Sequence, residues 1–259
     1  MTTPQFDIRP SLIKGDPADA YLHWTKEVMR LESLNPKVLM DFSTPNPGVL
    51  CGVEEAKALL LNVLPKVEQD RQASNGGDIV QVWAMEEGEK FEAGEPVLRV
   101  IAKYASFGLY ETSILGMLSS SSGWATASKE CVEAAGETTV IAYGARHIHP
   151  NVAHILDYAS VVGGCSSVST IIGSKHAGRN PLGNMPHSLP LLFGDTVAAA
   201  QAFDKHIGME TQRIVVVDTF KDEAEESLNV AEALRDRLRG IRLDTPAERG
   251  GVTPMLVKE

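Results

Sequence analysis

The spacing of apolar residues predicts helices and short strands in the first part of the chain. Apolar residues recur near a 3.6-residue period within residues 16–32, which predicts a helix that Asp16 can cap. A second helix is expected over 53–68, broken by Pro65. Residues 37–44 form a predicted strand, and period-2 alternation within 78–108, divided by turn residues, predicts a small β-rich module.

The serine run SSSSG at residues 119–123 divides the next apolar stretch, which covers residues 111–136. Apolar residues flank the run on both sides, so we expect a packed loop here rather than a flexible linker. The pattern therefore predicts separate helices joined at the serines.

From about residue 137, short apolar strands alternate with helices. In the clearest unit, residues 214–217 are apolar on both faces, as in a strand of a parallel sheet. Residues 221–240 predict a helix with acidic first turns, arginines in its last turns and Gly240 at its end, an order that suits the helix dipole. A strand at 241–246 completes a βαβ unit, and repeated units of this kind indicate a parallel sheet or barrel.

Composition narrows the class of protein. The 259 residues suffice for one large domain or two smaller ones, and the formal charge of −10 argues against nucleic acid as a partner. Neither a signal peptide nor an apolar run long enough to span a membrane is present, so no membrane association is expected. Cys51, Cys131 and Cys165 form no CxxC pair and are expected to be buried free thiols in a reducing cytoplasm.

Polar side chains follow five consecutive predicted strands in this second half. Because ligands gather at the carboxyl ends of parallel strands, we expect these side chains to share one site. In chain order they are Tyr143, Arg146, His147 and His149; then Ser166 and Ser167; then His187 and Ser188; then Asp218; and finally Asp244 with Arg242 two residues earlier.

Each of these residues also has a structural explanation. Capping of a helix or turn could account for Asp218 and Asp244, and Arg146 could pair with one of the many carboxylates. Tyr143 could belong to the core. His147 and His149 form an HxH pair that suggests a metal-dependent hydrolase, although the pair is expected in a loop and no second histidine pair follows.

Seven segments in order then resemble the nicotinate phosphoribosyltransferases, nearest to the group common in archaea. The resemblance covers nearly the whole chain. The segments are GDPADAYLHWTKEV, GEPVLRVIAKYASFGLYETSILGML, VIAYGARHIHP, VVGGCSSVS, GNMPHS, RIVVVDTFKDEAEE and GIRLDTPAERGG.

The resemblance implies an N-terminal α+β domain, residues 1–116, followed by an open, incomplete α/β barrel of the type II phosphoribosyltransferase kind, residues 117–259. It implies an enzyme of NAD salvage that joins nicotinate to phosphoribosyl pyrophosphate, with ATP and Mg²⁺ assisting. The product is nicotinate mononucleotide. A cytoplasmic homodimer is expected.

The resemblance also implies roles for single residues. His187 matches the histidine that carries a phosphoryl group, and Asp218 and Asp244 match carboxylates beside the ribose, the magnesium ion or the phosphates. The expected substrate-binding residues are Tyr21, reaching the neighbouring subunit's site, with Tyr143, Arg146, Ser166, Ser188 and Arg242. These types suit the chemistry, because nicotinate is a flat anion and pyrophosphate departs with large negative charge.

Two departures from the family pattern stand out. Ser166 and Ser167 occupy positions where the family usually has aspartate and glycine, which puts catalysis or the choice of pyridine in doubt. The family also continues past residue 259, and Thr253 with Pro254 begins a helix that has room for about one turn, so we expect a truncated sequence. A non-catalytic binding or assembly protein is therefore the main alternative, and a metal hydrolase using His147, His149 and His187 is a weaker one.

Overall fold

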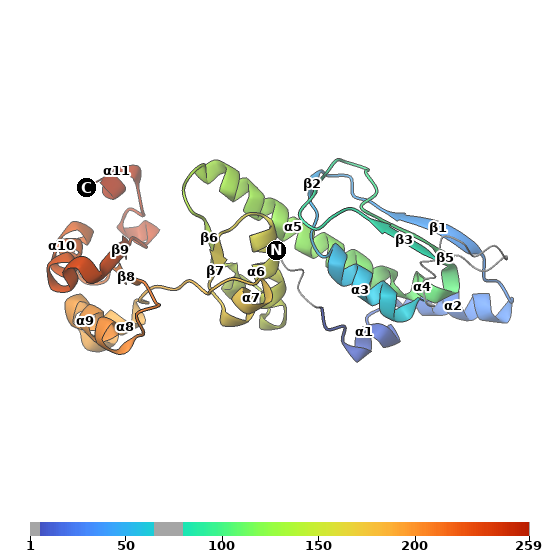
Figure 1. The fold of residues 1–259 in the computed structure, drawn as a ribbon, viewed down its shortest axis with the longest axis horizontal. Helices are drawn as coiled ribbons and strands as arrows, with labels where there is room; N and C mark the ends of the chain where they lie inside the picture. Colours follow the sequence, from blue (N-terminus) through green and yellow to red (C-terminus); the bar gives the residue numbers. More distant parts are fainter. Residues whose placement is uncertain (1–5, 65–79, 259) are drawn as a thin grey trace. The chain divides into compact units, whose positions relative to one another are not determined.

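The computed structural model describes residues 6–64 and 80–258, and the chain divides into two compact units. Unit 1 is Met1–Pro181 and unit 2 is Leu182–Glu259 (Figure 1). The expected division after residue 116 falls inside a continuous helix of unit 1 and stays a prediction. Pro65, expected to break a helix, lies outside the described residues; the helix before it, α3, is Val53–Val63.

An antiparallel sheet forms the first half of unit 1. Its strands lie in the order β1 (Lys37–Phe42), β5 (Leu98–Lys103) and β3 (Gln81–Ala84), which confirms the predicted β-rich module. Alternate residues of β5 are buried and pack with α3 and the start of α5 (Glu111–Ala135). The smaller elements are α1 (Pro10–Lys14), α2 (Ala20–Leu31), β2 (Gly48–Val49), β4 (Lys90–Phe91) and α4 (Tyr104–Phe107).

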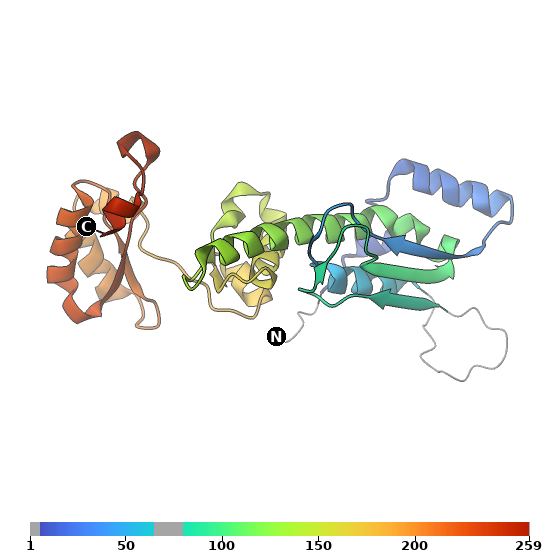
Figure 2. The same cartoon turned by 90° about the horizontal axis from the view of Figure 1, so that it is seen from above.

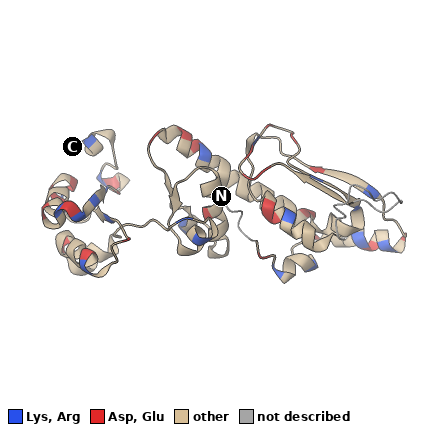
Figure 3. Ribbon diagram, viewed as in Figure 1, with Lys and Arg blue, Asp and Glu red and all other residues tan. Residues whose placement is uncertain are grey.

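The helix predicted over 16–32 is present as α2, but it starts later than expected. Asp19, not Asp16, is its N-cap residue, and the Asp19 side chain does not cap the helix. It accepts hydrogen bonds from the hydroxyls of Tyr21 and Thr112 instead, at 3.2 and 2.8 Å. Figure 3 shows both signs of charge along α2 and α3, where short-range ion pairs such as Arg30–Glu27 form.

The predicted loop at the serine run is wrong: residues 111–135 form one continuous helix, α5 (Figure 2). Tertiary contacts override the weak helix propensity of serine and glycine. A Cβ atom on Gly52 would lie 2.4 Å from the Met117 carbonyl oxygen, and one on Gly163 would lie 2.3 Å from the Ala125 carbonyl oxygen. Small residues thus let neighbouring segments touch the α5 backbone. Ser122 also ties Cys51 to the helix through both backbone groups of that cysteine.

The remainder of unit 1 contains the first parallel strand pair. Strands β6 (Ile141–Ala142) and β7 (Ser167–Val168) pair in parallel, connected through α6 (Ala153–Val162). Helix α7 (Ile171–His176) follows and packs on α6. Cys51 and Cys165 are buried free thiols as expected, whereas Cys131 is an exposed one because it lies on a solvent-facing side of α5.

Unit 2 is built on a second parallel pair, β8 (Arg213–Val216) and β9 (Leu238–Arg242), linked by α10 (Glu223–Leu234). This confirms the predicted βαβ unit. Its core joins the fully buried residues 215–217, at the end of β8 and just after it, to Met185, to Ala199 and Ala200 of α9 (Thr196–His206), and to Val230 and Leu234 of α10. Helices α8 (Ser188–Phe193) and α11 (Pro254–Lys258) complete the unit, the latter begun by Thr253 Oγ1, which accepts from the Leu256 amide at 3.2 Å.

The helix predicted over 221–240 ends six residues early, at Leu234. Arg235 has a positive φ of 51°, and residues from Leu238 onward pair with β8, so Gly240 lies in a strand rather than at a helix end. Pairing in the parallel ladder, together with the ion pair between Arg237 and Asp204, outweighs the helical charge pattern of these residues.

The mixed α/β class is therefore confirmed, with an N-terminal α+β region and a C-terminal α/β region. The described strands of the barrel region form separate two-stranded parallel sheets, so the barrel is not closed. Within the described parts of the chain, the helices lack the length or the apolar character required to span a membrane.

Candidate functional site

His187 is fixed in unit 2 by the backbone that leads to it. Met185 is fully buried in the core, and its amide donates a hydrogen bond to the Ile214 carbonyl of β8 at 3.1 Å. The segment GNMPHS therefore runs beside β8, and His187 stands at the start of α8. Its side chain is 36% exposed, so one edge of the imidazole faces solvent.

Asp218 follows the buried strand β8 and holds the imidazole from the protein side. The His187 Nε2 atom lies 2.8 Å from Asp218 Oδ1. The other oxygen, Oδ2, accepts a hydrogen bond from the Asp244 amide at 3.0 Å. The Asp218 side chain is fully buried, and both of its oxygens are occupied by protein groups. A carboxylate at Nε2 fixes the ring orientation and favours the tautomer with its proton on that nitrogen.

Asp244 and Arg242 lie on the other side of the histidine. Asp244 Oδ2 is 3.9 Å from His187 Nδ1 and 2.5 Å from a guanidinium nitrogen of Arg242. A second guanidinium nitrogen donates to the side-chain oxygen of Asn184 at 3.3 Å. His187, Asp218, Arg242 and Asp244, four of the residues predicted from the strand ends, thus meet in one cluster.

Helix or turn capping, the alternative explanation for Asp218 and Asp244, is not observed among the described residues. Helix α10 is capped by Asp222, whose side chain accepts from the Ala224 and Glu225 amides, and not by Asp218. Asp244 directs its carboxylate to Arg242 and His187. Both aspartates therefore serve the histidine cluster.

Several residues of this cluster were missed from the sequence. Asn184 supports Arg242, and Arg249 donates to the Asp218 carbonyl at 2.9 Å. Buried Glu223 accepts from Thr245 Oγ1 at 2.6 Å. Thr245 and Arg249 belong to the segment directly after β9. Their polar side chains close to a strand end were the sequence signal that could have identified them as part of the site.

The remaining predicted residues belong to unit 1. Tyr143 and Arg146 follow β6, as expected; Tyr143 is partly buried, and Arg146 is exposed. In the described part of the chain, Arg146 has neither a hydrogen bond nor an ion pair, so the alternative in which it pairs with a carboxylate is not observed. Tyr21 lies on α2, exposed over more than half of its surface.

Ser166 does not stand at the carboxyl end of its strand. It precedes β7, and its hydroxyl donates to the Val140 carbonyl at 3.0 Å, at the start of the parallel pair. Ser167 is buried and donates to the Asn180 carbonyl at 2.7 Å. Ser188 is the exposed first residue of α8, next to His187. The substrate-binding roles of Ser166 and Ser188 stay predictions.

The HxH pair has no metal-binding partners among the described residues. His147 and His149 are exposed, and His149 Nδ1 accepts from the Asn151 amide at 3.2 Å. Across residues 6–64 and 80–258, groups of three or more His, Cys, Asp or Glu side chains arranged to hold a metal ion are absent. The metal-hydrolase alternative therefore gains no support from the geometry.

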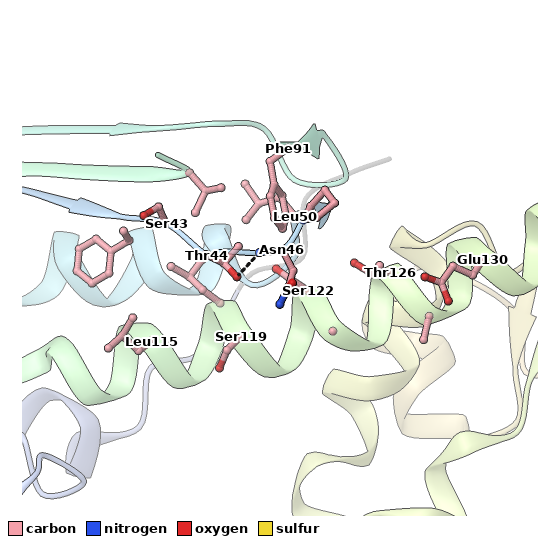
Figure 4. Close-up of a pocket in the computed structure, with 16 residues that line it drawn as sticks. Ser43, Thr44, Asn46, Leu50, Phe91, Leu115, Ser119, Ser122, Thr126 and Glu130 are labelled. Carbon is pink, nitrogen blue, oxygen red and sulfur yellow. Dashed lines mark hydrogen bonds between the residues drawn. The ribbon is translucent and has the colours of Figure 1, made fainter. Parts of the chain in front are cut away.

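A pocket of about 390 Å³ in unit 1 is separate from these residues (Figure 4). It lies between α5 and the loops of the antiparallel sheet, with Leu50, Phe91 and Leu115 among its apolar walls. Its hydroxyls hold structure together, since Thr126 Oγ1 accepts from the Val49 amide at 2.9 Å. The only charged residue among its described lining residues is Glu130, so the pocket is poorly suited to an anionic substrate.

Comparison with known proteins decides the family. The N-terminal domain of quinolinate phosphoribosyl transferase matches residues 19–122, and the C-terminal domain of the same family matches residues 124–256. The chain belongs to the quinolinate phosphoribosyl transferase family. The resemblance to phosphoribosyltransferases that act on pyridine carboxylates is therefore confirmed. The family match does not distinguish nicotinate from quinolinate as the substrate.

Individual relatives of this phosphoribosyl transferase family member carry pyridine-related names. The crystal structure of a nicotinate-nucleotide pyrophosphorylase from Pyrococcus furiosus is 38% identical with a TM-score of 0.87, covering 100% of this chain and 64% of that one. A nicotinate phosphoribosyltransferase of Mycobacterium tuberculosis is 28% identical over 169 residues, 63% of this chain and 36% of that protein. The human nicotinic acid phosphoribosyltransferase structure shares the fold at 21% identity and a TM-score of 0.64, covering 88% of this chain and 61% of that one.

The chain spans little more than a third of the curated relatives it matches, and 64% of the Pyrococcus furiosus chain.

Proposed function

We propose that the chain works as a nicotinate phosphoribosyltransferase, joining nicotinate to phosphoribosyl pyrophosphate and releasing pyrophosphate. The observation that carries the proposal is the His187 imidazole, held through Nε2 by buried Asp218 with its Nδ1 side beside Asp244. The names of the Pyrococcus furiosus and Mycobacterium tuberculosis relatives support a pyridine mononucleotide as the product. The location in the cytoplasm stays a prediction.

In this proposal His187 carries a phosphoryl group. When Nε2 donates its proton to Asp218, Nδ1 bears a lone pair that can attack the γ-phosphorus of ATP. A new N–P bond forms, the bond to the bridging β,γ-oxygen breaks, and ADP leaves with that electron pair. Water later takes the phosphoryl group, which returns the neutral imidazole and releases phosphate. Asp218 stabilises the charge that the ring acquires during both transfers.

Arg242 and Asp244 would meet the phosphate groups. Arg242 is partly exposed, and its planar guanidinium suits phosphate oxygens. Both oxygens of Asp218 are already occupied, but the half-exposed Asp244 has one oxygen, Oδ1, without a partner in the described chain. One carboxylate with substrate phosphates is a usual Mg²⁺ environment, so the donors fit the ion through Asp244. Bound Mg²⁺ would neutralise charge on the departing pyrophosphate.

The residues that the resemblance assigns to the pyridine are Tyr143, Arg146 and Ser166 in unit 1 and Ser188 in unit 2. Tyr143 offers an aromatic face, exposed Arg146 offers a cation for the nicotinate carboxylate, and the two serines offer hydroxyls. Quinolinate carries a second ring carboxylate, so the number of available cations decides between the two acids. The family match keeps quinolinate as the competing substrate.

A homodimer would bring Tyr21 to the neighbouring site. Tyr21, Trp24, Val28 and Leu31 recur on one side of α2, each more than half exposed, while Leu22 and Met29 are buried on the other side. An apolar stripe of this kind on a helix surface is typical of a protein interface. We propose that this stripe packs on a second copy of the chain.

The proposal is tested by phosphorylation and product formation in the same samples. The protein, His187→Ala and His206→Ala are incubated with γ-labelled ATP, and acid-labile label is expected on the first and third only; His206 is an exposed control at the end of α9. Product is then measured with phosphoribosyl pyrophosphate and either nicotinate or quinolinate.

Label on the His187→Ala variant would remove the phosphoryl role. Product from quinolinate alone, with loss of its 2-carboxylate as CO2, would replace nicotinate as the substrate. A folded protein that makes no product and binds neither acid by calorimetry would be a non-catalytic relative.

A further inference from the structure

The segment that follows β9 is joined to the turn between β8 and α10 by four side chains, those of Asp218, Glu223, Thr245 and Arg249. The Asp244 amide donates to Asp218 Oδ2 at 3.0 Å, and Thr245 Oγ1 donates to Glu223 Oε1 at 2.6 Å. Arg249 donates to the carbonyls of Asp218 and Lys221 at 2.9 and 3.3 Å. Each contact joins one residue of 244–249 to one of 218–223, so the two segments hold one geometry.

Glu223 is the charged centre of this connection. It is the first residue of α10 and is 7% exposed, beside the equally buried Thr245. Its Oε1 atom also lies 3.6 Å from a guanidinium nitrogen of Arg249. A carboxylate is rarely buried in this way without a partner, and here hydroxyl and guanidinium both supply one.

Helix capping does not explain the burial of Glu223. Asp222 already accepts from the Ala224 and Glu225 amides and caps α10. The other buried glutamate of this helix, Glu226, has its own structural partner in Thr196 on α9, at 3.0 Å. Glu223 instead reaches across to the segment that carries Asp244.

We propose that Glu223, acting through Thr245 and Arg249, is a positioning residue that sets the place of Asp244 against His187. This inference rests on the proposed function, because the value of that placement lies in phosphoryl and phosphoribosyl transfer. The ladder between β8 and β9 ends where the Val217 amide meets the Arg242 carbonyl at 3.3 Å, so Asp244 lies beyond the last strand hydrogen bond. Arg242 holds the Asp244 carboxylate, whereas the backbone at Asp244 depends on its contact with Asp218 and on the contacts of Thr245 and Arg249 that follow it.

The distance that this connection controls is the 3.9 Å between Asp244 Oδ2 and His187 Nδ1. Transfer to Nδ1 brings a phosphoryl group into this space, where a carboxylate too close would repel it and one too far could not share a bound cation. Catalytic geometry is sensitive at this scale, and a misplacement of about 1 Å can cost on the order of a hundredfold in rate.

The experiment replaces Thr245, which contacts neither His187 nor a substrate phosphate in the arrangement proposed above. Thr245→Val keeps the shape and removes the hydroxyl, and Thr245→Ser restores the hydroxyl. Thr211→Val is the matched control in the turn before β8, where the Thr211 side chain has no hydrogen-bond partner within the described chain. For each variant we would measure kcat and KM for nicotinate, and amide hydrogen exchange at Asp244.

In Thr245→Val, kcat is expected to fall tenfold or more with little change in KM, and the Asp244 amide to exchange on the order of tenfold faster. The core amides of β8 should keep their protection. Thr245→Ser should recover both values, and Thr211→Val should match the unmodified protein. If the Asp244 amide and kcat are unchanged in Thr245→Val, the positioning role is wrong.

Failure of the proposed function gives a different result. In that case no variant makes product, including the unmodified protein, while Thr245→Val still exchanges faster at Asp244. Glu223→Gln provides a second test of the charge. It should loosen Arg249 and raise exchange at Asp244, and unchanged exchange there would also contradict the positioning role.

Discussion

Replacing Arg213 tests whether unit 2 depends on a buried cation far from the histidine cluster. Arg213 is 3% exposed at the start of β8, and Nε donates to Asp204 Oδ1 at 3.0 Å. Its other nitrogens donate to the carbonyls of Asp204, Ile207, Gly208 and Thr211 at 2.5–3.0 Å. One side chain thus organises the whole turn between α9 and β8.

Arg213→Met keeps the hydrocarbon length and removes the charge and all five hydrogen-bond donors. Breaking a buried ion pair costs about 3–5 kcal/mol, because the remaining charge loses its partner. Asp204 keeps its contact with Arg237, and the freed carbonyls of Ile207 and Gly208 lie in exposed positions where water can reach them. We therefore expect the lower end, about 3 kcal/mol, which is a large part of the roughly 5–15 kcal/mol typical of a domain.

The assay is urea unfolding followed by two signals. The three tryptophans, at positions 24, 83 and 124, all belong to unit 1, so tryptophan emission reports on that unit while far-UV circular dichroism reports on both. Arg213→Met should move part of the circular dichroism transition to lower urea and leave the emission transition in place. Arg239→Met, on an exposed position of β9, is the control. If the two variants unfold within about 0.5 kcal/mol of each other, the reasoning about the buried cation is refuted.

Three further changes address burial, backbone conformation and assembly. Burial raises the pKa of Asp157, so this carboxyl stabilises the fold when protonated and loses that contribution as pH rises. Asp157→Asn should therefore raise Tm at neutral pH and leave it unchanged near pH 4; an equal effect at both would contradict the burial argument. Gly52→Ala forces a Cβ against the Met117 carbonyl at a φ of +87°, and a loss of about 2–4 kcal/mol in chemical unfolding is expected, whereas no loss would deny the close packing. Trp24→Glu on α2 should convert a dimer to a monomer by light scattering, and an unchanged mass would exclude this stripe as the interface.

The βαβ unit of residues 213–242 could be predicted because its signals are local. A strand buried on both faces needs a run of apolar residues, and such a run is visible without knowledge of the rest of the chain. The end of α10 could not be predicted in the same way. The arginines at 235, 237 and 239 suit a helix end, but pairing with β8 draws residues from 238 onward into a strand.

The serine run of α5 is a second place where tertiary contacts, and not the local sequence pattern, decide the structure. Propensity and composition describe the run as a break, whereas the structure uses its small side chains for contacts with Cys51 and with neighbouring backbone. The contacts of Gly52 and Gly163 with α5 join residues far apart in sequence. Single-sequence patterns contain no information about such approaches.

The sequence predicted the residues that form the histidine cluster, but not the residues that hold them in position. His187, Asp218, Arg242 and Asp244 follow from polar residues at strand ends. Glu223, Thr245 and Arg249 do not, because a buried glutamate at the start of a helix reads as ordinary helix-end charge. Ser166 was predicted to follow a strand, but it precedes β7. A strand of two residues is too short for its bounds to be predicted from the sequence.

The uninterrupted course of α5 has a consequence for recombination between relatives. The two family domains adjoin at residue 123, and that residue lies in the middle of a 25-residue helix. A chimaera spliced at this junction would combine two half-helices whose serine and glycine contacts were selected against different neighbours. A crossover between Pro181 and Leu182 instead leaves every helix and both parallel strand pairs intact. A crossover at that point is therefore expected to disturb fewer contacts of the described chain than one at the family boundary inside α5.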